Sequence, residues 1–130
     1  MLGTFVMIAA GHSASEIDSS FFKDMGFPMT PGVINPSFVE HDVRGSDYKQ
    51  VILHRLEDWS KSCEKSDVPG FVVFDMNQMY NRITAIGFRD LVTKTISLHV
   101  GIVVICGEEE RDDYTSLIQS IQRSWPSLYT

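Results

Sequence analysis

Short, continuously apolar runs alternate along this chain with longer segments in which apolar residues recur at helical spacing. The clearest runs span residues 4–10, 71–75 and 100–106. Runs of this length are typical of strands that are buried on both faces of a parallel sheet. Strands that alternate with helices predict an α/β fold, in which helices cover the sheet. We therefore predict a single α/β domain over residues 1–130, with about four mostly parallel strands and about four helices.

The segments between these runs carry helix signals. Residues 13–16, Ser-Ala-Ser-Glu, have the spacing of a capping box and predict a helix that ends near Gly26. Further helices are predicted at about 47–63, 84–98 and 108–125. A more exposed second strand is predicted over 38–43, with an irregular connection over 26–37, and the run 100–106 is the predicted central strand.

Two helical stripes are predicted to pack on the sheet. Their members recur three or four residues apart, as one buried helix face requires. They are Val51, Ile52, Leu56 and Trp59 on one helix, and Phe88, Leu91 and Val92 on the other.

Composition restricts the partners of this chain. Eleven Lys and Arg against 17 Asp and Glu give a net charge of −6 at pH 7, and the basic residues are scattered. A nucleic acid or an anionic membrane needs clustered basic residues, so we expect neither as a partner. The first apolar run follows no basic segment and no run is long enough to cross a bilayer, so we expect a cytoplasmic location.

Neither metal nor cofactor chemistry is indicated by the motifs. Cys63 and Cys106 form no CxxC pair, and the histidines lack metal-ligand spacing. No glycine-rich phosphate loop is present, so we expect no cofactor. The acidic residues at 108–113 match the start of a helix, where exposed amides favour negative charge.

Candidate functional residues follow the predicted strands. His12 comes shortly after the first strand and Asp75 ends the strand 71–75. Because the carboxyl ends of parallel strands meet at one edge, we expect these two residues near the same edge. A carboxylate beside an imidazole favours its cationic form and orients the ring, as a general base or a phosphorylated histidine requires.

The chain from the strand that ends at Asp75 into the following helix resembles STAS domains, the family of the bacterial anti-sigma factor antagonists. In that family a strand ending in an acidic residue leads to a helix that opens with Asp-Ser-Ser-Gly-Leu. Here Gly87-Phe88 and Leu91 stand at the positions of the Gly-Leu pair and the following Leu. The resemblance covers residues 38–122 and implies a strand at each of three positions, each followed by a helix.

The STAS resemblance implies a non-enzymatic regulatory module that binds a protein, such as a kinase or a regulatory protein, and leaves homo-oligomerisation open. The implied interaction residues are Asp75, Arg82, Thr84, Ala85, Gly87 and Arg89. Thr84, Ala85 and Ile86 replace the family's Asp-Ser-Ser, so only Thr84 could accept a phosphate there. Phosphate at a helix N-terminus adds charge to a binding face. We expect the surface formed by Arg82, Thr84, Ala85 and Arg89 to be exposed.

Two alternatives remain open at this stage. Thr84 could serve only as an N-cap, with its hydroxyl bonded to the backbone of Gly87. Separately, the pair Gly11-His12 and the later Asp75 resemble mannose-type IIA phosphocarrier domains of the sugar phosphotransferase system. That resemblance implies a histidine phosphocarrier with His12 and Asp75 as its site, although Asn77-Gln78-Met79 replaces the family's paired glycines.

Overall fold

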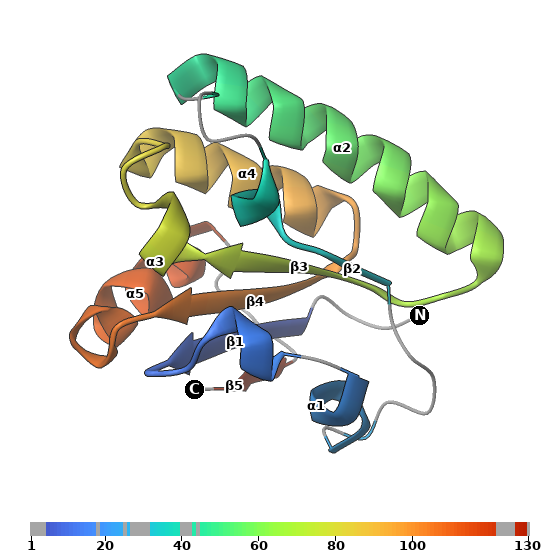
Figure 1. Cartoon of the computed structure of the whole chain (residues 1–130), viewed down its shortest axis with the longest axis horizontal. Helices are drawn as coiled ribbons and strands as arrows, with labels where there is room; N and C mark the ends of the chain where they lie inside the picture. Colours follow the sequence, from blue (N-terminus) through green and yellow to red (C-terminus); the bar gives the residue numbers. More distant parts are fainter. Residues whose placement is uncertain are drawn as a thin grey trace.

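A parallel five-stranded sheet forms the centre of this computed structural model, which describes residues 5–17, 19–24, 26, 32–39, 43, 45–121 and 127–129. The strand order is β2-β3-β4-β1-β5 (Figure 1). The strands are β1 (Phe5–Ala10), β2 (Gly32–Ile34), β3 (Gly70–Asp75), β4 (Gly101–Cys106) and β5 (Ser127–Tyr129). The predicted α/β fold with a parallel sheet is therefore confirmed, and β4 is the central strand as expected.

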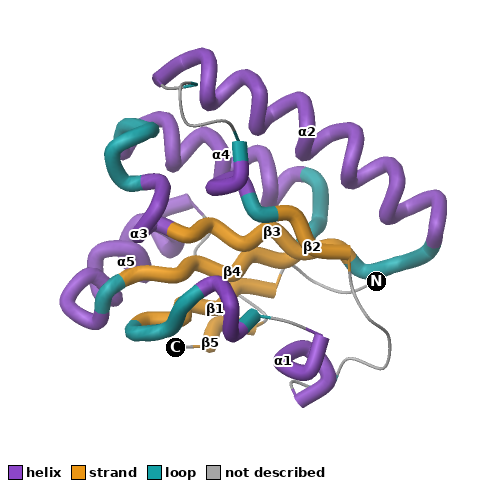
Figure 2. Tube along the Cα trace, viewed as in Figure 1, coloured by secondary structure: helices purple, strands orange, loops and turns teal. Residues whose placement is uncertain are grey.

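Helices cover the sheet on both faces, as Figure 2 shows. They are α1 (Ser19–Asp24), α2 (Gly45–Ser66), α3 (Met76–Met79), α4 (Ala85–Ser97) and α5 (Arg111–Ile121), with short 3-10 helices η1 (Ala14–Glu16), η2 (Pro36–Phe38) and η3 (Glu108–Glu110). Side chains of α2, α4 and α5 pack in one hydrophobic cluster, and those of η1 and α1 join a second. The sheet therefore lies between two layers of different size.

Alternating side chains of each strand supply the two clusters. Val72 and Phe74 of β3 join the larger cluster, whereas Phe71 and Val73 join the smaller one. The same alternation holds in β4, every residue of which is buried. Because successive side chains of a strand point to opposite faces, a strand buried on both faces is apolar throughout.

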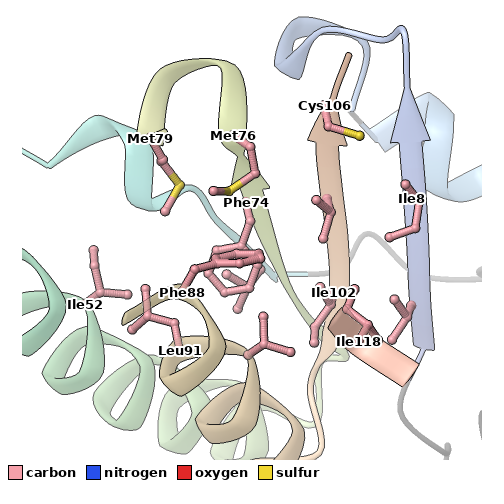
Figure 3. Packing of buried hydrophobic residues seen from close by; sticks show 14 of the residues in the cluster. Ile8, Ile52, Phe74, Met76, Met79, Phe88, Leu91, Ile102, Cys106 and Ile118 are labelled. Atoms are coloured by element: carbon pink, nitrogen blue, oxygen red, sulfur yellow. The ribbon is translucent and has the colours of Figure 1, made fainter. Parts of the chain in front are cut away.

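Helix α4 is held to the sheet and to α5 by aromatic contacts. The ring of Phe88 lies edge-on to Phe74, with centroids 5.3 Å apart, and edge-on to Tyr114 at 5.7 Å. Figure 3 shows Phe88 and Leu91 of α4 directed toward the side chains of the sheet. Such edge-to-face pairs add to the stabilisation from buried area.

The two predicted helix faces are buried for the most part. Ile52 and Leu56 of α2 are at most 1% exposed, and the predicted residues of α4, Phe88, Leu91 and Val92, are also buried. Val51 and Trp59 are only partly buried, so the prediction is confirmed in its inner residues and not at its margins.

The strand predicted over residues 38–43 is wrong where the structure describes it. Phe38 ends η2 instead, while 40–42 lie outside the described residues. Pro36 presets a helical φ, and the Asn35 side chain accepts a hydrogen bond from the amide of Ser37 at 3.0 Å. The second strand is β2, inside the segment predicted as an irregular connection, because it pairs with the first residues of β3.

Other boundaries differ from the prediction for local reasons. The first predicted helix is divided into η1 and α1, since Ile17 leaves helical geometry at φ −92° and ψ 81°. Neither helix α3, directly after Asp75, nor strand β5 was predicted. The predicted ends at Thr4, Met25 and residues 122–126 lie outside the described residues. Within the described part, no helix combines the length and apolarity needed to cross a membrane.

Trp59 is expected to anchor α2 over the first residues of β2 and β3. A Cβ atom added at Gly70 would lie 2.7 Å from Cη2 of Trp59, and one at Gly32 would lie 3.5 Å from Nε1. We predict that Trp59→Ala lowers the free energy of unfolding by about 3 kcal/mol, the lower end for a large aromatic truncation because the ring is partly exposed. Urea denaturation measures this, with Lys61→Ala on the exposed face of α2 as the control. Equal stability of the two variants would contradict the packing of this ring.

Candidate functional site

At the carboxyl edge of the sheet, the connections that follow the neighbouring parallel strands β1 and β4 cross the sheet in opposite directions. From β1 the chain passes η1 and α1 on one face and reaches β2 at one edge, whereas from β4 it passes α5 on the other face and reaches β5. The segments after these neighbouring strands thus leave toward opposite faces. In open α/β sheets, ligands bind in the crevice at such a switch point. The residues that follow β1 and β4 are therefore candidate site residues.

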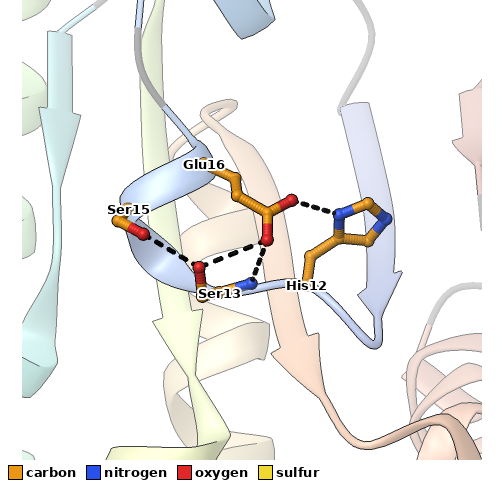
Figure 4. Close-up of polar contacts among 4 residues, drawn as sticks. All are labelled: His12, Ser13, Ser15 and Glu16. Atoms are coloured by element: carbon orange, nitrogen blue, oxygen red, sulfur yellow. Dashed lines mark hydrogen bonds and ion pairs between the residues drawn. The ribbon is translucent and has the colours of Figure 1, made fainter.

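His12 lies in the turn that follows β1. Gly11 adopts a positive φ of 80° and donates its amide hydrogen bond to the carbonyl of Cys106 at 2.9 Å, which fixes the turn against the end of β4. His12 Nδ1 lies 2.6 Å from Glu16 Oε2, and each side chain is 52% exposed (Figure 4). Glu16 thus holds one nitrogen of the ring.

Glu16 also closes the predicted capping box. Its Oε1 accepts hydrogen bonds from the amide of Ser13 at 3.2 Å and from Ser13 Oγ at 3.3 Å, and Ser13 Oγ lies 2.9 Å from Ser15 Oγ. The hydrogen bond from His12 contributes most to lowering the pKa of Glu16 below its usual value, and the Ser13 amide adds to this. The carboxylate therefore stays ionised and keeps the turn and η1 in one arrangement.

Asp75 lies at the same edge of the sheet as His12, as predicted. Ala10 pairs with Cys106 and Asp75 pairs with Ile105, so the carboxyl ends of β1 and β3 lie on either side of the end of β4. The carboxylate that contacts His12 is nevertheless that of Glu16. The phosphocarrier resemblance implied that Asp75 shares a site with His12, and the structure gives the adjacent role to Glu16.

Asp75 is a buried carboxylate at the end of β3. It is 6% exposed, and its Oδ1 has no hydrogen-bond partner among the described residues. Burial raises the pKa of Asp75, and the nearby amides of Asn77 and Gln78 oppose this in part. Burial thus disfavours the charged form of Asp75, and the carboxyl is not available as a surface group.

Carboxylates surround the turn that carries His12. A Cβ atom added at Gly11 would lie 3.0 Å from Glu108 Oε1, so the Glu108 carboxylate lies against the backbone beside His12. The carboxylates of Glu16 and Glu108 would therefore repel a phosphoryl group added at this turn. Within the described residues, no three His, Cys, Asp or Glu side chains are arranged to hold a metal ion.

Thr84 caps α4. Its Oγ1 accepts a hydrogen bond from the amide of Gly87 at 3.0 Å, which is the contact that the capping interpretation predicts. Gly87 is buried, and a Cβ atom there would lie 2.8 Å from Ile83 Cγ1. Glycine is thus needed at position 87 for close packing of the helix start rather than for a ligand.

Arg82 is not part of an exposed surface, and the prediction is wrong in this respect. The residue is 4% exposed, and its guanidinium donates hydrogen bonds to the carbonyl of Ser37 at 3.2 Å and of Val43 at 3.1 Å. It also lies over the ring of Tyr48, 4.2 Å from the centroid. Both carbonyls lie about forty residues before Arg82 in the chain, so the local sequence did not indicate that this cation is buried. Thr84, Ala85 and Arg89 are exposed as predicted.

The structure adds two exposed apolar residues next to Thr84. Tyr80, just after α3, is 68% exposed, and Ile86, in the first turn of α4, is 75% exposed. Ile86 lies off the helical stripe formed by Phe88, Leu91 and Val92, so its exposure could have been inferred from the spacing. We define the α3–α4 surface as Tyr80, Thr84, Ala85, Ile86 and Arg89.

Comparison with known proteins gives no relative. No protein-family model matches this sequence, and a search of curated proteins finds no similar sequence. The function is therefore inferred from the geometry of the α3–α4 surface and of the carboxyl edge.

Asp75 should make stability depend on pH. A carboxyl whose pKa is raised on folding favours the protonated form, so its contribution is present below the unfolded pKa and lost as pH rises through the folded pKa. Asp75→Asn, which is neutral and of similar shape, should raise the free energy of unfolding at pH 7 and change it less at pH 3. Urea denaturation at both pH values tests this, with Asp58→Asn on the exposed side of α2 as the control. A loss of stability at pH 7 would show that the ionised carboxylate is stabilising.

Proposed function

We propose that this protein is a non-enzymatic regulatory module that binds a protein partner through the α3–α4 surface. The observation that supports this is the exposure of Tyr80 and Ile86 on either side of the capped start of α4. Isolated exposed apolar side chains are common, but these two stand only six residues apart in the chain, before and after the start of one helix, which makes them candidates for contact with the same partner. Aromatic side chains are enriched at protein interfaces, where they bury large areas.

Charge favours the same surface for an acidic partner. The chain carries a net charge of −6, yet residues 76–89 contain no Asp or Glu. Arg89 is exposed there, whereas Lys49 and Lys94 form ion pairs with Asp90 and Glu57. An acidic partner would thus meet less repulsion on the α3–α4 surface than at the carboxylate-rich start of α5. The resemblance to STAS domains points to the same helix entrance, but the first strand that it implies, over 38–43, is not formed by the described residues of that segment.

Phosphorylation of Thr84 is the proposed form of regulation. The residue is exposed and is the N-cap of α4, where the helix amides favour negative charge. A phosphate there would replace a neutral cap with a dianion in the middle of the α3–α4 surface. The partner's affinity would change, while α4 would keep a favourable interaction at its N-terminus.

A histidine phosphocarrier centred on His12 is the second candidate. It is supported by the 2.6 Å contact with Glu16, which holds Nδ1 and leaves the half-exposed ring its other nitrogen for chemistry. The nearby Glu108 carboxylate weighs against it, because it would repel a phosphoryl group. Acid treatment separates the two modified forms, since phosphohistidine is acid-labile and phosphothreonine is not.

The proposed docking surface predicts where a partner can be crosslinked. A photo-crosslinking amino acid at position 86, expressed in the source cell, should give a defined adduct that Tyr80→Ser abolishes. Position 33 is the matched control, because Val33 is also an exposed apolar residue, at 44%, but lies in β2. Equal adducts from the two positions, or an adduct at 86 that persists in Tyr80→Ser, would contradict the assigned surface.

If phosphorylation of Thr84 regulates partner binding, two substitutions at this position should differ in their effect. Thr84→Glu should leave the circular dichroism spectrum unchanged and change the yield of the position 86 adduct at least about tenfold, as added charge at an interface can. Thr84→Ser keeps a capping hydroxyl and should preserve the yield. A folded Thr84→Glu variant with the wild-type yield would leave Thr84 as a cap without a regulatory role.

A further inference from the structure

We infer that Arg82 is a positioning residue that fixes the α3–α4 surface in its binding conformation. It does so by tying the connection between α3 and α4 to the chain around η2 and the start of α2. This inference rests on the proposed function, because it concerns the surface on which the partner binds.

The side chain of Arg82 joins segments that are distant in the sequence. Its Nη1 donates to the carbonyl of Ser37 at 3.2 Å, and its Nη2 donates to the carbonyl of Val43 at 3.1 Å. Its guanidinium carbon lies 4.2 Å from the centroid of the Tyr48 ring. One buried side chain thus connects three points on the chain between η2 and the first turns of α2.

The backbone around Arg82 and the hydroxyl of Tyr48 complete the same assembly. The Arg82 amide donates to Met79 at 2.9 Å, and the Arg82 carbonyl accepts from the amide of Gly45 at 3.0 Å. Tyr48 Oη donates to the carbonyl of Pro36 at 2.7 Å. The connection is therefore held through the Arg82 side chain and through both backbone hydrogen-bonding groups of Arg82.

The role of Arg82 follows from the geometry of its guanidinium. A buried cation needs hydrogen-bond acceptors, and its removal would leave the carbonyls of Ser37 and Val43 without these donors. The planar guanidinium offers donors in fixed directions and so can serve two carbonyls at once, which a lysine ammonium on a flexible stem does poorly. What Arg82 supplies beyond an apolar side chain is a fixed relation between the segments.

This fixed relation determines how the docking residues are presented. Tyr80 lies in the connection, two residues before Arg82, and Ile86 lies in the first turn of α4, four residues after it, so Arg82 anchors the segment that carries both. A surface held in one conformation before binding loses less conformational entropy when a partner docks. Loss of the anchor should therefore weaken docking without removing any residue of the α3–α4 surface.

Hydrogen exchange tests the anchor without a partner. In Arg82→Met, amides of the peptide covering 80–86 should exchange at least about tenfold faster, as expected for the loss of hydrogen bonds to a charged group. Protection in β4 should stay at the wild-type level. Tyr48→Phe, which removes only the hydroxyl, is the control and should change exchange of 80–86 less. Wild-type exchange of 80–86 in Arg82→Met would overturn the inference.

Arg82→Lys covers the case in which Arg82→Met does not fold. It keeps the charge and loses the two-carbonyl geometry, so exchange of 80–86 should still rise while β4 remains protected. Equal loss of protection in β4 and in 80–86 for this variant would overturn the inference, because Arg82 would then support the whole fold.

The crosslinking assay separates this inference from the proposed function. If both hold, Arg82→Lys lowers the yield of the position 86 adduct several-fold, and Tyr80→Ser abolishes the adduct with unchanged exchange of 80–86. An adduct that depends on Tyr80 and not on Arg82 would leave the docking surface standing and overturn the positioning role. An adduct independent of Tyr80 would reject the docking surface itself, whatever the exchange rates show.

Discussion

Burial of the parallel sheet on both faces is the constraint on which the rest of this structure depends. β4 is central and buried along its whole length, so its neighbours must also contribute apolar side chains to both faces. Parallel pairing requires each connection to cross a face of the sheet. Here the connections cross both faces, so helices lie on both sides. It also brings the ends of β1, β3 and β4 to one edge, with His12 and Asp75 near that edge.

Two buried ionisable residues at the carboxyl side of the fold differ in how their surroundings accommodate them. Asp75 has an oxygen without a hydrogen-bond partner among the described residues, and burial raises its pKa. Arg82 meets two carbonyls and an aromatic ring. A buried carboxyl can become neutral by taking up a proton, whereas a guanidinium remains charged and must be satisfied by its surroundings. This difference explains why Arg82, and not Asp75, connects distant segments.

The polar features of α4 serve packing and recognition at separate positions. Thr84 and Gly87 complete the start of the helix, one as a cap and one through the absence of a side chain. Ile86 and Arg89 face away from the sheet and contribute nothing to the described core. The helix entrance is therefore stable without them, which leaves these positions free to serve a partner.

Sequence alone determined the α/β class, the central strand β4 and the main bodies of α2 and α4, because periodicity is a local property of the chain, and it offered the cap at Thr84 as one of two alternatives. It did not locate β2, since three residues form a strand only by pairing with β3. Nor did it reveal that Glu16 contacts His12 or that Arg82 is buried. The Arg82 contacts reach carbonyls about forty residues away in the chain. The tertiary structure brings η2 and α2 beside the α3–α4 connection, and only this arrangement decided which predicted site residues are exposed.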